Sequence, residues 1–195
     1  MHVFPQGVFL PSIPNTTEGL EAFCEQFLVA RKRLRPDASL PETVPFELGE
    51  TIGGDQRKFS LFYKRMTVPM IQICAHNERD SRCGILGPLL HSEFVRLRRL
   101  RESGTGASST LTLHVVSSSH LGGHIWAGNV IVSIPFRFLL EDGKKSPLEG
   151  KSIWYGRVEP KHVETILKET LGQGRIIHEL LRGIHPSAPE AERRQ

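Results

Sequence analysis

One long amphipathic segment between two short apolar runs limits the possible folds more than any other feature of the sequence. Residues 85–102 carry apolar side chains at the three- and four-residue spacing of one helical face, and Pro88 suits the first turn. The runs at 67–73 and 110–116 are typical of strands. A helix between two strands predicts a sheet with helices packed on it. The apolar stripe of this helix consists of Leu86, Leu90, Phe94, Leu97 and Leu100.

The segment that follows predicts more strands and two further helices. Strands are expected at 127–134 and 152–158, and Pro160 is expected to open a helix. A last helix is expected at 175–181, with Gly183 as its cap. This order of elements predicts an α/β domain in which helices cover a central mixed sheet, although the strands and helices do not alternate strictly and follow one another as in an α+β protein. It matches the C-terminal half of a thioredoxin-like sheet.

Composition divides the chain into three parts. Residues 1–60 are expected to hold one helix and a linker, with the linker in the Pro- and Gly-rich stretch 36–58. Residues 61–183 are expected to form the thioredoxin-like domain. Residues 184–195 contain too few apolar side chains to pack and are expected to be a disordered tail.

The first helix is indicated by capping residues and by an apolar stripe. Thr16 and Thr17 are suitable N-caps, and apolar residues recur at helical spacing until Pro36. Cys24 lies on that stripe and is expected to be buried as a small hydrophobic residue.

Charge and composition indicate which kinds of partner and which compartment to expect. The net charge of +4 is mild, and no apolar run approaches the roughly 20 residues of a membrane span, so neither nucleic acid nor membrane is an expected partner. Three cysteines cannot all pair within one chain, which favours a reducing compartment. No targeting segment is visible at the N-terminus. A solvated helix face is expected for four arginines, with docking of an acidic partner as the alternative: Arg96, Arg98, Arg99 and Arg101.

Two cysteines and two histidines carry the chemistry. Cys74 and Cys83 enclose a polar stretch, which predicts thiols near the surface, and His120 and His124 enclose a Gly-Gly pair at a strand end. The four residues could hold zinc, although eight residues between the cysteines is long for such a site. The cysteines could instead form a thiol–disulfide couple. The set is also that of a Rieske 2Fe-2S centre, and unligated loop residues remain the fourth reading.

Four segments carry a resemblance to a known family. They are CAHNERDSRCGILGPLL, HLGGHIWAGNVIV, IWYGRVEPKHV and GRIIHELLRG, and they occur in this order between residues 66 and 183. Together they resemble the sucrase/ferredoxin-like family of thioredoxin-like 2Fe-2S ferredoxins, and most closely its fungal members. Family members carry a further segment upstream of Met1, and Ile125 stands where they often have a basic residue.

The resemblance implies an electron carrier rather than a catalyst, with one 2Fe-2S cluster on Cys74, Cys83, His120 and His124. Its partners would be a reductase upstream and an unknown electron acceptor, and its compartment mitochondrial, with the cytosol as the alternative. Neutral imidazoles in place of two thiolates would raise the reduction potential and couple it to pH. For His76, contact with the cluster's ligands and simple solvation are both open.

Three more positions lie within the resembling segments. Trp126 and Trp154 are expected to pack in the interior. By resemblance alone, residues 155–157, which include Arg157, would frame the cluster loop.

Overall fold

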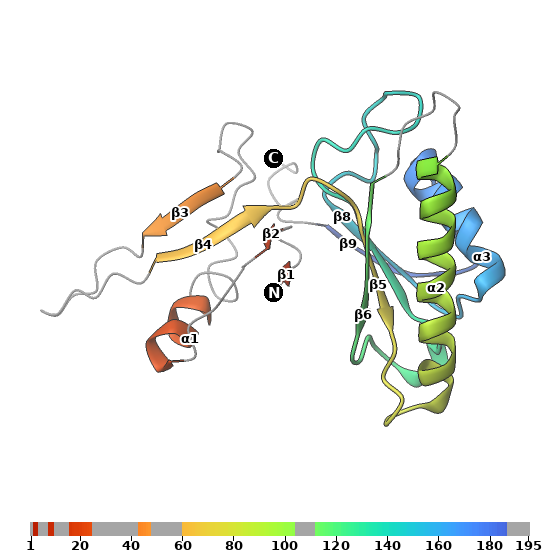
Figure 1. The fold of residues 1–195 in the computed structure, drawn as a ribbon, viewed down its shortest axis with the longest axis horizontal. Helices are drawn as coiled ribbons and strands as arrows, with labels where there is room; N and C mark the ends of the chain where they lie inside the picture. Colours follow the sequence, from red (N-terminus) through yellow and green to blue (C-terminus); the bar gives the residue numbers. More distant parts are fainter. Residues whose placement is uncertain are drawn as a thin grey trace, which may run out of the picture. The chain divides into compact units, whose positions relative to one another are not determined.

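The computed structural model describes residues 2–3, 8–9, 16–24, 43–47, 60–103 and 112–186, in part by backbone alone. Contacts between residues divide the chain into two compact units, one of residues 1–66 with 186–195 and one of residues 67–185 (Figure 1). Among the helices within those ranges, none combines the length and the apolar character that crossing a bilayer requires.

The first unit contains a short helix and an antiparallel four-stranded sheet in the order β1-β2-β4-β3. Its elements are β1 (His2–Val3), β2 (Val8–Phe9), α1 (Thr17–Phe23), β3 (Thr43–Glu47) and β4 (Ser60–Arg65). The stretch 36–58 is therefore not a linker throughout, because β3 lies within it. Pro45 has no N–H to donate, and it is tolerated because β3 is an edge strand. The rest of that stretch lies outside the described residues.

Helix α1 begins as predicted, but Cys24 is not buried. The Thr16 hydroxyl accepts a hydrogen bond from the Gly19 N–H at 3.1 Å, which confirms Thr16 as the N-cap. Cys24 follows α1 in helical conformation, and the residues after it lie outside the described part of the chain. Leu20 on that stripe is 50% exposed, and the Cys24 thiol is exposed.

The second unit holds a five-stranded mixed sheet in the order β6-β5-β7-β8-β9. Strand β6 runs parallel to β5, whereas β7 is antiparallel to β5 and β8 is antiparallel to β7. The predicted class, a central mixed sheet covered by helices, is confirmed and is consistent with a thioredoxin-like fold. The strands are β5 (Met70–Cys74), β6 (His114–Ser118), β7 (Val130–Ser133), β8 (Lys151–Tyr155) and β9 (Leu181–Pro186). The helices are α2 (Ser81–Ser103), η2 (His124–Trp126), α3 (Pro160–Thr165) and the π-helical η3 (Ile166–Gly172).

The two long helical segments cover one face of this sheet. Figure 1 shows α2 and α3 on the same side of the strands, and both helices contribute to the main core. Alternate strand residues point to that core, because side chains of a strand alternate between faces. They are Ile71, Ile73, Val130, Val132, Ile153 and Tyr155, which pack with Leu90, Phe94, Val163, Ile166 and Leu167.

Helix α2 starts earlier than its apolar stripe indicates. It begins at Ser81, so that Cys83 lies in its first turn and Pro88 lies in its interior rather than in the first turn. Leu90 and Phe94 are fully buried, which confirms the core of the stripe, but Leu100 at its end is 55% exposed.

The predicted last helix is wrong. Residues 174–180 form an irregular segment with a turn, and β9 follows with Gly183 inside it rather than at a helix end. Without β9, strand β8 would be left with an unpaired edge, and pairing that edge outweighs the weak helical periodicity of residues 175–181. Residues 184–186, expected in the tail, belong to this strand, and the remaining tail residues lie outside the described part of the chain.

Candidate metal centre

Cys74 and Cys83 lie side by side where strand β5 ends and helix α2 begins. Their side chains are 2% and 3% exposed, and they pack in one small cluster with Ala127 and Leu121. Both thiols are free. The expectation that they lie near the surface is therefore wrong, because Cys83 belongs to a helical turn that faces inward rather than to a polar loop.

Local contacts fix the start of α2 against the end of β5. The Asp80 carboxylate accepts a hydrogen bond from the Arg82 N–H at 2.9 Å, which satisfies one of the free donors of the first helical turn. A side chain at Gly87 would place its Cβ 2.7 Å from the Cys74 carbonyl oxygen. The helix can therefore approach the strand closely enough to bring the two sulfur atoms together.

The electrostatics of the pair keep Cys83 protonated in the metal-free protein. Burial, followed by the adjacent Cys74, raises the pKa of the Cys83 thiol, while the Gly128 N–H acts in the opposite direction. The Cys74 thiol donates a hydrogen bond to the Ser119 carbonyl at 3.3 Å. A metal that replaces both protons would offset the buried charge of the thiolates, since thiolates are the form that binds metals.

The structure brings the segment just before His120 to Cys74, because Ser118 pairs with Cys74 in the sheet. Strand β6 ends at Ser118, whose carbonyl accepts a hydrogen bond from Ala75 N–H at 3.0 Å, and His120 follows two residues later. The His120 ring lies 6.2 Å from the His76 ring, centroid to centroid, in an edge arrangement. His76 is 27% exposed in its side chain, and its buried Nδ1 has no hydrogen-bond partner, so simple solvation does not describe it.

The fourth predicted ligand, His124, lies in the short helix η2, and only its backbone is described. Among the side chains that the structure does describe, no group of three or more His, Cys, Asp and Glu residues could hold a metal ion. The two cysteines are thus brought together, and the ligation by both histidines stays a prediction.

Two residues near the site were missed by sequence reasoning, Asn129 and Arg182. The Arg182 guanidinium lies 4.9 Å from the centre of the Trp126 ring and donates a hydrogen bond to Asn129 Oδ1. Arg157, expected by resemblance to frame the loop, lies 4.5 Å from the same ring. The Trp126 ring therefore makes cation–π contacts with two arginines, in addition to the packing role expected for it. The only available signal was that both missed residues lie within the segments that resemble the family.

The surroundings of the cysteines fit a sulfur-rich, negatively charged group. The Gly128 N–H faces Cys83, and the buried Asn129 Nδ2 has no hydrogen-bond partner. Unused donors of this kind are what thiolates and sulfides accept from. Among the described side chains, Cys74 and Cys83 are the two that could hold such a group, and His120 directly follows Ser119, whose carbonyl contacts the Cys74 thiol.

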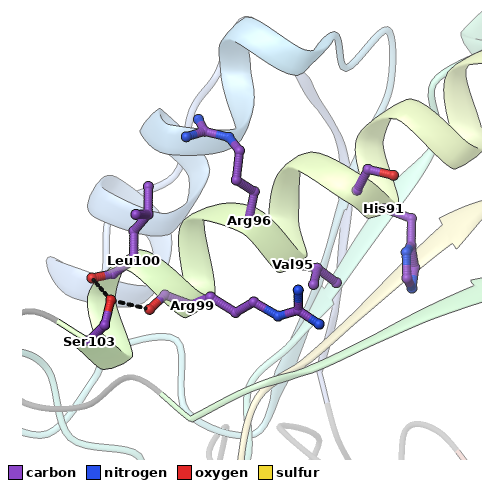
Figure 2. Close-up of a pocket in the computed structure, with 7 residues that line it drawn as sticks. His91, Val95, Arg96, Arg99, Leu100 and Ser103 are labelled. Carbon is purple, nitrogen blue, oxygen red and sulfur yellow. Dashed lines mark hydrogen bonds between the residues drawn. The ribbon is translucent and has the colours of Figure 1, made fainter.

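A pocket on helix α2 is separate from these residues (Figure 2). It begins two helical turns beyond Cys83 and is bordered by His91, Val95, Arg96, Arg99, Leu100 and Ser103. Glu93 holds Arg96 in an ion pair of 2.6 Å, and the Ser103 hydroxyl donates a hydrogen bond to the Arg99 carbonyl at 2.9 Å. None of these contacts involves a residue of the candidate centre.

The chain matches the sucrase/ferredoxin-like family over residues 1–183 and belongs to it. Relatives named "Altered inheritance of mitochondria protein 32" include one from Meyerozyma guilliermondii, 31% identical over 88% of this chain and 53% of the relative. Another, from Debaryomyces hansenii, is 37% identical over 71% of this chain and 44% of the relative. The chain thus spans about half the length of these relatives.

Solved structures similar to this chain include a thioredoxin-like [2Fe-2S] ferredoxin from Aquifex aeolicus. It is 14% identical, with a TM-score of 0.44, over 63% of this chain and 97% of the ferredoxin. Its Cys55Ser variant is also 14% identical, with a TM-score of 0.42, over 59% of this chain and 98% of that one.

Proposed function

We propose that this chain is an electron-transfer protein that binds one 2Fe-2S cluster through Cys74, Cys83, His120 and His124. The observation that carries the proposal is the pair of free, buried thiols held side by side at the end of β5. Membership of the sucrase/ferredoxin-like family supports it. When bound, the cluster would supply a site that takes up and releases one electron.

The protein residues would hold this group and set its affinity for the electron. Cys74 and Cys83 would give thiolate ligands from a strand end and a helix start, and the histidines would give neutral ligands from the loop after β6. Two neutral ligands in place of two thiolates leave the cluster less negative, which favours the reduced state. The Gly128 N–H is placed to donate to the Cys83 sulfur and would favour it further.

A second candidate is a thiol–disulfide couple formed by Cys74 and Cys83. Their side-by-side position favours it, since a disulfide needs the two sulfur atoms to meet. The raised pKa of Cys83 weighs against it, because the thiolate is the reactive form. A structural zinc site is the third reading of the same residues.

The proposed partners are a reductase that supplies the electron and an acceptor that takes it, with no nucleic acid and no membrane. A mitochondrial location is proposed because the relatives are named for the inheritance of mitochondria. The cytosol is the alternative.

The test is anaerobic iron–sulfur reconstitution followed by absorption and EPR spectra of the dithionite-reduced protein. We expect a low average g value in the wild type, a shift toward ordinary ferredoxin values in His120→Cys and His124→Cys, and loss of the cluster in Cys74→Ala. Cys24→Ser is the matched control, because that exposed cysteine lies outside the site. Zinc or a disulfide in place of a chromophore would contradict the proposal.

A further inference from the structure

Asn129 lies directly opposite Cys74 in the sheet. The register pairs Ile73 with Val130, so the next antiparallel pair is Cys74 with Asn129, and the Cys74 N–H donates to the Asn129 carbonyl at 3.0 Å. Residues that face each other in an antiparallel pair project to the same face of the sheet with Cβ atoms about 4.5–5.5 Å apart. The Asn129 side chain therefore stands beside the cysteine site.

The amide of Asn129 is buried and only half satisfied. The residue is 2% exposed, its Oδ1 accepts the hydrogen bond from Arg182, and its Nδ2 has no partner. Because arginine has donors and no acceptor, the amide must turn its oxygen toward Arg182 and its NH₂ group away. A buried donor without a partner is costly, which indicates that a group outside the protein chain completes it.

Arg182 is itself held in place by its neighbours. Its guanidinium stacks on Trp126, and a side chain at Gly122 would place its Cβ 3.0 Å from Arg182 Nη1. A side chain at Gly156 would place its Cβ 2.5 Å from Arg182 Cδ. The absence of side chains at Gly122 and Gly156 thus leaves room for Arg182, whose Nη1 reaches Asn129.

We propose that Asn129 Nδ2 donates a hydrogen bond to a sulfur atom of the bound cluster, and that Arg182 is the positioning residue that orients this amide. The inference rests on the proposed function and deepens it. A donor to sulfur stabilises the reduced cluster more than the oxidised one, because reduction adds negative charge. Asn129 and Arg182 therefore raise the reduction potential of the cluster.

The experiment measures the midpoint potential and the EPR g values of the reconstituted 195-residue protein by dithionite titration. Asn129→Leu removes the donor, and we expect an equilibrium constant for reduction about tenfold lower, which is about 59 mV for one electron. Arg182→Lys keeps the charge but loses the fork, and a smaller negative shift is expected. The g values stay those of the wild type, because the ligands do not change.

Ser133→Ala is the matched control. Ser133 is a buried polar residue on the same face of β7, four positions after Asn129, and its hydroxyl pairs with Ser152 at 2.9 Å. A purely structural role for Asn129 would lower the melting temperature and the cluster content but leave the potential unchanged, which would overturn the inference. Should Asn129→Leu fail to load, the near-isosteric Asn129→Asp must show the negative shift. A wild-type protein that binds no cluster would overturn both the proposed function and this inference. A wild-type protein that binds the cluster, with an Asn129 variant of unchanged midpoint potential, would overturn this inference alone.

Discussion

Gly128 lies two residues before β7, and its backbone conformation suits glycine alone. Its φ of +88° is in the left-handed region, and an added Cβ would lie 2.5 Å from the Val158 carbonyl oxygen. The same residue directs its N–H to Cys83. Gly128 thus makes a close backbone contact with Val158 and also directs a hydrogen-bond donor at the cysteine site.

Gly128→Ala is expected to destabilise the protein by more than the roughly 1–2 kcal/mol of left-handed backbone strain, because the clash with Val158 adds to it. Gly143→Ala is the matched control, since Gly143 has φ +77° but no atom within 4 Å of an added Cβ. Urea unfolding monitored by tryptophan fluorescence gives both values. Equal losses in the two variants would mean that strain alone, without the clash, accounts for the effect.

The residues of the candidate site were predictable from sequence only where chemistry marks them. Cysteines and histidines in polar surroundings stand out, so the sequence alone singles out Cys74, Cys83, His120 and His124. It does not single out Asn129 and Arg182, because an asparagine before a strand and an arginine near the C-terminus are ordinary residues until the register brings them together. The exposure of Cys24 was missed because helical spacing does not reveal whether another element covers the apolar face of the helix.

At the level of elements, α2 was predicted because its apolar spacing is distinctive over several turns. The start of α2 at Ser81 was not predicted, because most residues before Gly84 are polar. The first turn is fixed instead by Asp80 and by contacts with the end of β5. The helix predicted at 175–181 falls on the irregular segment before β9, and β9 itself was not predicted because its pairing with β8 is decided by the sheet, not by the local sequence. Of the four arginines expected on a solvated face, three are engaged in ion pairs: Arg96, Arg98 and Arg101.

Two residues of the same predicted stripe on α2 are expected to respond very differently to truncation. Phe94 is fully buried in the main core, so Phe94→Ala should destabilise the protein by about 3–5 kcal/mol. Leu100 is 55% exposed, so Leu100→Ala should change stability by no more than about 0.5 kcal/mol. Chemical denaturation of both variants is the measurement. A large loss in Leu100→Ala would show that a partner or a further part of the chain covers the end of the helix.

Across the whole molecule, the three cysteines differ in their access to solvent. Cys24 belongs to the first unit and is exposed, whereas Cys74 and Cys83 are buried in the second. The sequence predicted a reducing compartment from the odd number of cysteines, but it assigned burial the wrong way round. The exposure of a cysteine depends on which helices and strands pack around it, and this packing cannot be read from the residue type.

Thiol labelling of the metal-free, reduced protein is expected to show one fast cysteine and two slow ones. The raised pKa of Cys83 lowers its thiolate fraction near neutral pH, so its reaction should accelerate at higher pH than that of an ordinary thiol. Mass spectrometry after a short exposure to iodoacetamide identifies the fast residue. Cys24→Ser should remove the fast phase, and unfolding in urea should expose all remaining thiols; two fast thiols in the native wild type would contradict the burial of the pair.

The position of Arg182 in the last strand has a consequence for the order of events in synthesis. Cys74 leaves the ribosome more than one hundred residues before Arg182, which at about 5–20 residues per second is an interval of several seconds. Throughout that interval the cysteines exist without the arginine that completes their surroundings, and β8 has no neighbour on its outer edge. The contact between Arg182 and Asn129 therefore forms only after β9 has been synthesised, well after both cysteines.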